Sequence, residues 1–205
     1  MEQLQGALEQ AKEGHGQIMG AIGEPGLGKS RLFCEFKLTS QRGCLVLDAF
    51  AVSHGKVSPY LPVVELLKNY FQIEPADDER ARRAKLMGQV LALDKSLEET
   101  LTYLLALLGI EGPDSSLQQM DAQIRRKRRF EALKKLSLRE SLNQPLLLLF
   151  EDLHWIDTET QGFLHILTES VVNAPLLLLV NYRPRVSPRV GAKDVLHQAA
   201  PLAAW

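Results

Sequence analysis

The sequence predicts an α/β fold in which helices cover both faces of a mainly parallel sheet. Three observations lead to this prediction. Apolar runs of strand length occur at residues 17–22, 44–52, 145–152 and 175–184. Segments whose apolar residues recur at helical spacing separate these runs. The runs are apolar almost throughout instead of alternating with polar residues, which is typical of parallel strands buried on both faces.

Composition supports a globular domain and excludes several other classes. The chain has 205 residues, of which 45% are hydrophobic and 24% are charged, which is enough for one domain with its own core. Its net charge of -1 gives no overall field that would attract nucleic acid or anionic lipid. Two cysteines are too few for a disulfide framework, so we expect a cytoplasmic location. No apolar segment reaches the roughly 18 residues that a membrane-spanning helix needs.

The N-terminal part of the chain predicts a helix, a strand and a second helix. Leu4, Ala7, Leu8 and Ala11 recur at helical spacing ahead of two glycines. The apolar strand at 17–22 leads into a glycine-rich segment, and a helix is expected from Lys29 to about Thr39. The strand at 44–52 follows.

Residues 58–143 predict a helical insertion between the second and third strands. Four segments with helical periodicity occur there, separated by turn signals, and no strand pattern interrupts them. After the strand at 145–152, Asp157 or Thr158 is expected to cap a helix. The strand at 175–184 follows, and residues 195–202 predict a weak fifth strand.

A phosphate-binding loop is predicted by the segment AIGEPGLGKSRL at residues 21–32. It fits the pattern G-x-x-x-x-G-K-[ST] at Gly23, Gly28, Lys29 and Ser30, between a strand and a helix. Glycines allow the backbone N–H groups to wrap a phosphate chain, and the helix adds its unpaired N–H groups. Lys29 can reach the β- and γ-phosphates, and the Ser30 hydroxyl can ligate Mg²⁺.

Two alternative interpretations of the glycines fit the sequence less well. One is a glycine-rich turn with a chance lysine, which the strand before and the helix after the segment disfavour. The second is a dinucleotide-binding loop, whose G-x-G-x-x-G spacing Gly23, Gly26 and Gly28 do not match. The residues expected to contact a nucleotide are Gly23, Glu24, Pro25, Gly26, Leu27, Gly28, Lys29, Ser30 and Arg31.

Paired carboxylates at the end of the third strand provide a second signal. Glu151 and Asp152 directly follow four leucines and a phenylalanine. A phosphate loop needs a carboxylate at the end of a neighbouring strand to hold Mg²⁺, and a second carboxylate can orient the attacking water. Position favours Glu151 as the metal-side residue and Asp152 as the base, and the sequence also allows the reverse assignment. A solvated turn is the alternative for such a pair in isolation.

Three further features have both a functional and a structural interpretation. Arg183, just past the fourth strand, could contact the γ-phosphate or be a surface arginine before a proline. His154 could sense phosphate, although a packing role is favoured. The basic run RRKRR at 125–129 favours a solvated helical face over a contact with phosphate or with an acidic partner.

Taken together, these segments resemble the STAND-type, AAA-like P-loop ATPases, in particular the bacterial module that adjoins cyclase domains. The resemblance lies in GQIMGAIGEPGLGKSRL, SPYLPVVELLKNYF, RRFEALKKL, PLLLLFEDLHWIDTETQGFL and LLLLVNYRP. It implies a three-layer P-loop NTPase fold with strand order 5-1-4-3-2, the last strand being weak or missing. It also implies that ATP or ADP binds with Mg²⁺.

The resemblance further implies roles for individual residues and for the context of the domain. Lys29, Glu151, Asp152 and Arg183 would be catalytic, and Ser30 with the two acids would form the metal site. The chain lacks the family's G-R-E box and helical lid, so we expect residues 1–205 to be a single, truncated domain. Fused or partner signalling domains, such as a cyclase and helical repeats, and homo-oligomers are implied as partners.

Two functions from different classes are consistent with the sequence. The first is a slow, Mg²⁺-dependent ATPase that acts as a signalling switch. The second is a module that binds an adenine nucleotide and a protein partner without significant hydrolysis. A nucleic-acid-linked ATPase using residues 125–129 is weaker, and the motifs that read guanine are absent from the sequence.

Overall fold

A parallel sheet runs through the molecule. The computed structural model describes residues 1–52, 58–110, 116–183 and 200–201. The strands are β1 (Gln17–Ile22), β2 (Leu45–Phe50), β3 (Leu146–Glu151), β4 (Leu176–Tyr182) and the two-residue β5 (Ala200–Pro201). They lie in the order β2-β3-β4-β1-β5, and every pairing is parallel. Counted from the β5 edge, this order is 5-1-4-3-2.

The strands form because their leucine-rich sequences have both faces covered. In β3, Leu146 and Leu148 belong to one core cluster, whereas Leu147 and Leu149 belong to another. The leucines of β4 divide between the two clusters in the same way. Successive side chains of a strand point to opposite faces, so an unbroken apolar run supplies both cores.

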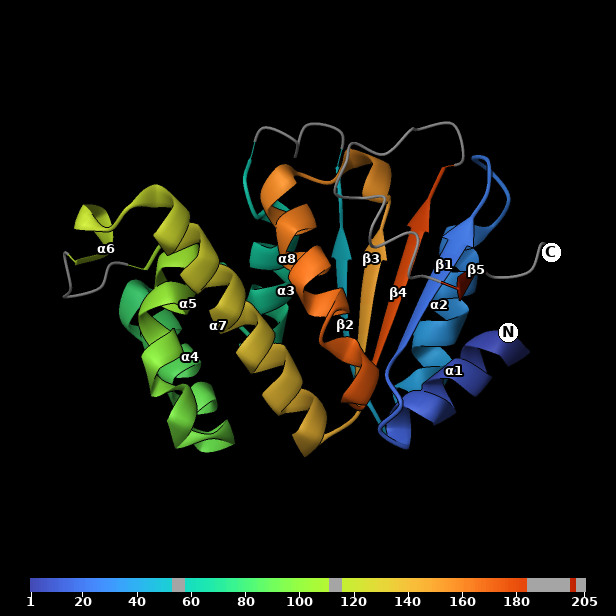
Figure 1. Cartoon of the computed structure of the whole chain (residues 1–205), viewed down its shortest axis with the longest axis horizontal. Helices are drawn as coiled ribbons and strands as arrows, with labels where there is room; N and C mark the ends of the chain where they lie inside the picture. The colour runs from blue at the N-terminus through green and yellow to red at the C-terminus, as the bar shows by residue number, and fades with distance from the viewer. Residues whose placement is uncertain (53–57, 111–115, 184–199, 202–205) are drawn as a thin grey trace.

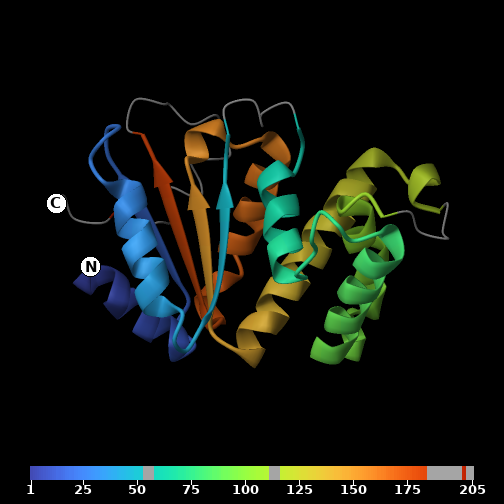
Figure 2. The ribbon, with the colours of Figure 1, turned by 180° about the vertical axis from the view of Figure 1, so that it is seen from behind.

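Two helices cover one face of the sheet, and a larger helical layer covers the other. Helices α1 (Glu2–Lys12) and α2 (Lys29–Ser40) pack with the cluster that contains Leu147 and Leu149. Helix α8 (Thr158–Thr168) and the insertion pack with the other cluster. The two views show α8 in front of the sheet in Figure 1 and α2 in front of it in Figure 2.

The insertion lies beyond the β2 edge of the sheet (Figure 1). Its elements are α3 (Leu61–Tyr70), α4 (Glu79–Leu93), the 3₁₀ helix η2 (Lys95–Thr100), α5 (Leu101–Leu107), α6 (Ser116–Gln119) and α7 (Ala122–Asn143). Leu86, Val90 and Leu104 of the insertion are fully buried and belong to the same cluster as Leu146 and Leu148 of β3. The insertion therefore shares a core with the sheet.

One helix ends earlier in the structure than its sequence pattern indicates. The helical pattern of the sequence at residues 157–172 extends to Val172, but α8 ends at Thr168, and the 3₁₀ turn η4 (Val171–Asn173) follows it. There Gly16 N–H donates to Val172 O, and a Cβ on Gly16 would lie 1.9 Å from Val171 O. This close approach requires the chain to turn before β4. Most of the expected fifth strand at 195–202, and Pro184 of the fourth, lie outside the described residues.

Candidate functional site

The predicted phosphate loop joins β1 to α2 at the carboxyl end of the sheet (Figure 1). Gly26 and Gly28 have φ angles of 85° and 79°, a region that favours glycine, so the loop needs glycine at both positions. Gly28 also caps α2 without any side-chain hydrogen bond to the first N–H groups of the helix. An anion is the natural acceptor for such N–H groups, and the helix dipole favours negative charge there.

Lys29 lies folded over this loop. Its Nζ donates to the carbonyl oxygens of Gly23 and Glu24 at 2.7 and 2.9 Å. The N–H of Gly23 donates to Tyr182 O at 3.3 Å, which ties the loop to the end of β4. The ammonium is thus held inside the loop, where it can exchange backbone carbonyls for phosphate oxygens.

Several other side chains of the loop are exposed to solvent. Glu24, Pro25 and Leu27 are exposed, with Leu27 at 66%. The Arg31 guanidinium, which was expected to contact the nucleotide, is exposed and pairs with Glu35 one turn along α2, at 3.4 Å.

The two acids at the end of β3 have different environments. Glu151, the last residue of the strand, is 7% exposed, whereas the Asp152 side chain is 44% exposed. Asp152 leaves the strand with a φ of 57°, an uncommon conformation for a residue other than glycine. Burial raises the pKa of Glu151, although hydrogen bonds from Ser30 and Asn181 oppose this effect. The Ser30 side chain therefore lies close to the strand-end carboxylate of Glu151.

Asn181 is a site residue that the sequence reasoning did not identify. Its Nδ2 donates to Glu151 Oε2 at 2.9 Å, and its Oδ1 accepts from the N–H of Asp152 at 2.7 Å. The side chain is buried, with 1% of the residue exposed. One signal could have revealed it: Asn181 is a polar residue near the end of an apolar strand, on the face of the sheet that also bears Glu151.

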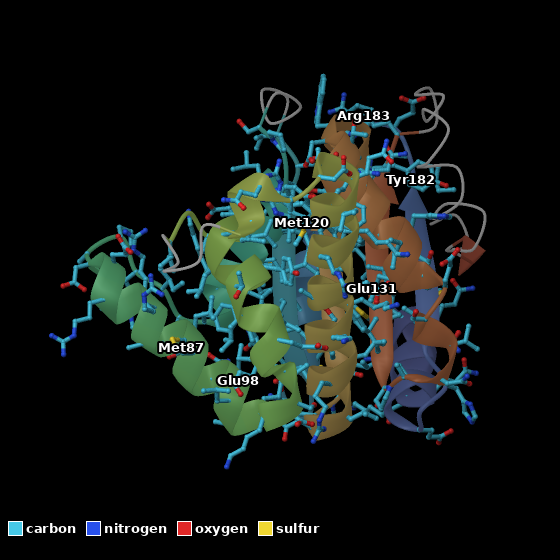
Figure 3. The ribbon with its side chains drawn as sticks, turned by 60° about the vertical axis from the view of Figure 1, so that its left-hand side comes forward. Met87, Glu98, Met120, Glu131, Tyr182 and Arg183 are labelled. Atoms are coloured by element: carbon cyan, nitrogen blue, oxygen red, sulfur yellow. The ribbon has the colours of Figure 1, made fainter. Side chains whose placement is uncertain are left out.

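Arg183 follows directly after β4, and Figure 3 shows it with Tyr182 at the upper end of that strand. It is half-buried at the end of the sheet where Glu151, Asn181 and the phosphate loop also lie. The predicted site residues Lys29, Ser30 and Glu151 thus come together, and Arg183 is at the same edge.

A family model described as AAA ATPase domain matches residues 1–180. The chain belongs to the AAA ATPase domain family. No curated protein matches it. The match extends over the phosphate loop, the acidic pair and most of β4, so the geometry described above belongs to a P-loop ATPase domain.

The oxygen ligands of this AAA ATPase domain suit Mg²⁺ held jointly with phosphate. Ser30 supplies a hydroxyl and Glu151 a carboxylate that lie close together, and Asp152 adds a second carboxylate nearby. Among the described residues, no group of three or more His, Cys, Asp or Glu side chains could hold a metal ion by itself. Mg²⁺ commonly takes one or two protein carboxylates together with substrate phosphates, so this ligand set fits the ion.

His154 lies in the 3₁₀ turn η3 (Leu153–Trp155), which follows the acids. Its side chain is only 3% exposed and its ring centroid lies 5.0 Å from that of Trp155. Its Nδ1 lies 3.8 Å from Asp152 Oδ1, which is beyond hydrogen-bond distance. These contacts agree with the packing interpretation.

The basic run on α7 is not simply a solvated face, as the sequence suggested. Arg125 donates to Leu117 O at 2.9 Å, and Arg126 donates to both carboxylate oxygens of Glu159 on α8. Arg129 lies over the ring of Tyr60, 5.7 Å from its centroid. Arg126, Lys127 and Arg128 are exposed, as expected of a solvated face, although Arg126 is also paired with Glu159.

Membrane insertion through a helix finds no support in the described ranges. None of the helices there is both long and apolar enough to cross a bilayer.

Proposed function

We propose that this domain binds ATP and ADP with Mg²⁺ and hydrolyses ATP slowly. The observation that supports the proposal most directly is the proximity of Ser30 to Glu151, whose pKa the Ser30 side chain helps to lower. This proximity joins the end of the phosphate loop to the end of β3, where the metal that bridges a polyphosphate to the protein must sit.

Each residue has a role in this proposal that follows from its position. The N–H groups from Gly23 to Ser30 hold the phosphates, and Lys29 neutralises the β- and γ-phosphates. Ser30 and buried Glu151 hold Mg²⁺, with Asp152 available as a further metal contact. Exposed Asp152 orients the attacking water, and Arg183 contacts the γ-phosphate. The metal supplies charge stabilisation at the phosphates when it is bound.

We further propose that the domain is a nucleotide-controlled switch within a larger signalling protein. The turn that follows Asp152 leads directly to Asp157 and Glu159, which contact the insertion. A rearrangement of the acids on nucleotide binding would therefore reach the insertion within a few residues. Cyclase domains, helical repeats and homo-oligomers are the partners we propose for it. We propose a cytoplasmic location, with Cys34 and Cys44 as free thiols.

A phosphate-release assay on wild type and Asp152→Asn, paired with calorimetry of ATP and ADP binding, tests the proposal. We expect Asp152→Asn to lose turnover and keep nucleotide affinity within about threefold. Lys29→Ala should lose nucleotide binding, and Asp121→Asn, which retains a capping side chain at the start of α7, should behave as wild type. Binding without turnover in the wild type would instead indicate a nucleotide-binding module, and no binding would overturn the proposal.

A further inference from the structure

We propose that Asn181 is a positioning residue that holds Glu151 and Asp152 in the arrangement needed for metal binding and hydrolysis. The inference rests on the proposed function, because it concerns the same two acids. It goes further by assigning the orientation of both acids to one side chain on the neighbouring strand.

The register of the sheet places Asn181 where it can reach both acids. Phe150 on β3 pairs with Val180 on β4, so Asn181 stands beside Glu151. Its other neighbour is Ala21 of β1, next to the start of the phosphate loop. Asn181 therefore lies between the strand that bears the acids and the strand that leads into the loop.

The side chain of Asn181 replaces a backbone partner at the point where β3 leaves the sheet. Asp152 adopts the left-handed conformation, with φ 57° and ψ 45°, and lies beyond the last β3–β4 pair, Phe150 with Val180. The Oδ1 of Asn181 accepts a hydrogen bond from the N–H of Asp152 at 2.7 Å. A buried N–H without an acceptor is costly, so the hydrogen bond helps hold Asp152 in its turned conformation.

The other half of the same amide orients Glu151. Its Nδ2 donates to Oε2 at 2.9 Å, while the Ser30 side chain lies close to the same carboxylate. An ionised carboxylate only accepts and an N–H only donates, so these two partners fix which end of the amide faces which acid. Residues that orient a metal ligand in this way typically change metal affinity or activity 10- to 100-fold when they are replaced.

Three substitutions separate the two halves of this amide. Asn181→Leu removes both hydrogen bonds at similar volume. Asn181→Asp keeps an acceptor for the Asp152 N–H but places a second carboxylate against Glu151. Asn181→Ser retains a hydroxyl that can both donate and accept. Tyr182→Phe is the matched control on the same strand, because it removes only a hydroxyl group.

The experiment measures kcat, KM and ADP affinity by calorimetry with and without Mg²⁺, on the full chain. For Asn181→Leu and Asn181→Asp we expect kcat to fall about 10- to 100-fold. The gain in ADP affinity that Mg²⁺ gives should shrink about tenfold, while metal-free ADP affinity stays within about twofold. Asn181→Ser should retain the most activity, and Tyr182→Phe should match wild type.

Several results would overturn the inference. Folded Asn181→Leu and Asn181→Asp with wild-type kcat and an unchanged Mg²⁺ effect would do so. A parallel loss of metal-free ADP affinity would show a purely structural role. If Asn181→Leu does not fold, Asn181→Ser and Asn181→Asp decide the question. If the wild type shows no turnover, only the proposed hydrolysis is refuted, since the effect of Mg²⁺ on ADP affinity still tests the role of Asn181. A wild type whose ADP affinity does not respond to Mg²⁺ would contradict both the proposed function and the role of Asn181.

Discussion

The main-chain N–H of Tyr60 donates a hydrogen bond to Asp157 Oδ1 over 3.0 Å, although 97 positions separate the two residues. Tyr60 precedes α3 with a φ of 64°, and Asp157 caps α8. The same carboxylate also accepts from the N–H groups of Glu159 and Thr160 and from the Thr160 hydroxyl. One buried aspartate thus fixes the insertion to the turn that follows the acidic pair.

Asp157→Ala should therefore lower the free energy of unfolding by more than the loss of an ordinary helix cap does. A cap is worth about 1 kcal/mol, and leaving the buried Tyr60 N–H unsatisfied adds about 1–3 kcal/mol. We expect the free energy of unfolding, from urea titrations, to fall by about 2–4 kcal/mol. Asp157→Asn, which keeps Oδ1, should cost less. Asp121→Ala, at the more exposed cap of α7, should cost about 1 kcal/mol. Equal losses for Asp157→Ala and Asp121→Ala would contradict this account.

Gly162→Ala should destabilise the protein, although alanine normally favours a helix over glycine by about 1 kcal/mol. A Cβ on Gly162 of α8 would lie 2.8 Å from Arg126 Nη2 and 2.8 Å from Phe130 Cζ on α7. Phe130 is buried, so its ring has little room to move. Gly88→Ala on α4 is the control, because nothing lies within 4 Å of its Cβ. Thermal unfolding should show a lower Tm for Gly162→Ala and a higher one for Gly88→Ala. A rise in both would refute the close packing of α7 on α8.

The ion pair between Arg126 and Glu159 should contribute modestly and depend on salt. Arg126 Nε lies 2.8 Å from Glu159 Oε2, with the two side chains 44% and 25% exposed. Partly exposed pairs are worth about 0.2–1 kcal/mol, and salt screens them. A double-mutant cycle with alanine should give a coupling energy in this range that falls in about 1 M NaCl. The more exposed pair Lys135–Glu99 should give a smaller coupling energy. A coupling energy that does not change with salt would argue against an electrostatic origin.

Local patterns predicted the parts of the molecule that local physics determines. Unbroken apolar runs predicted the four longer strands, because only burial on both faces explains leucine at every position of 146–149. The spacing of Gly23, Gly28, Lys29 and Ser30 predicted the phosphate loop, because few other uses require those residues between a strand and a helix.

Contacts between distant residues were the parts that the sequence did not predict. Asn181 lies 30 positions from Glu151, and only the register of β3 and β4 brings them together. The basic run looked solvated because the pattern of α7 alone does not show that Glu159 and Tyr60 face it. The early end of α8 depends on the approach of Gly16, which no periodicity within the helix indicates.

Glu151→Gln should stabilise the nucleotide-free protein at neutral pH. Burial raises the pKa of Glu151, so the folded state binds this proton more tightly than the unfolded state. Its contribution to stability is therefore greatest below the ordinary glutamate pKa of about 4.3, and it is lost as the pH rises through the raised value. Glutamine carries no charge, so the Tm of Glu151→Gln relative to wild type should rise between about pH 4 and pH 7. Glu13→Gln, at an exposed position at the end of α1, is the control. With Mg²⁺ and ATP present, the Tm of wild type should exceed that of Glu151→Gln, because the metal needs the carboxylate. A Tm difference that is constant across pH would show that the charge of Glu151 is not destabilising.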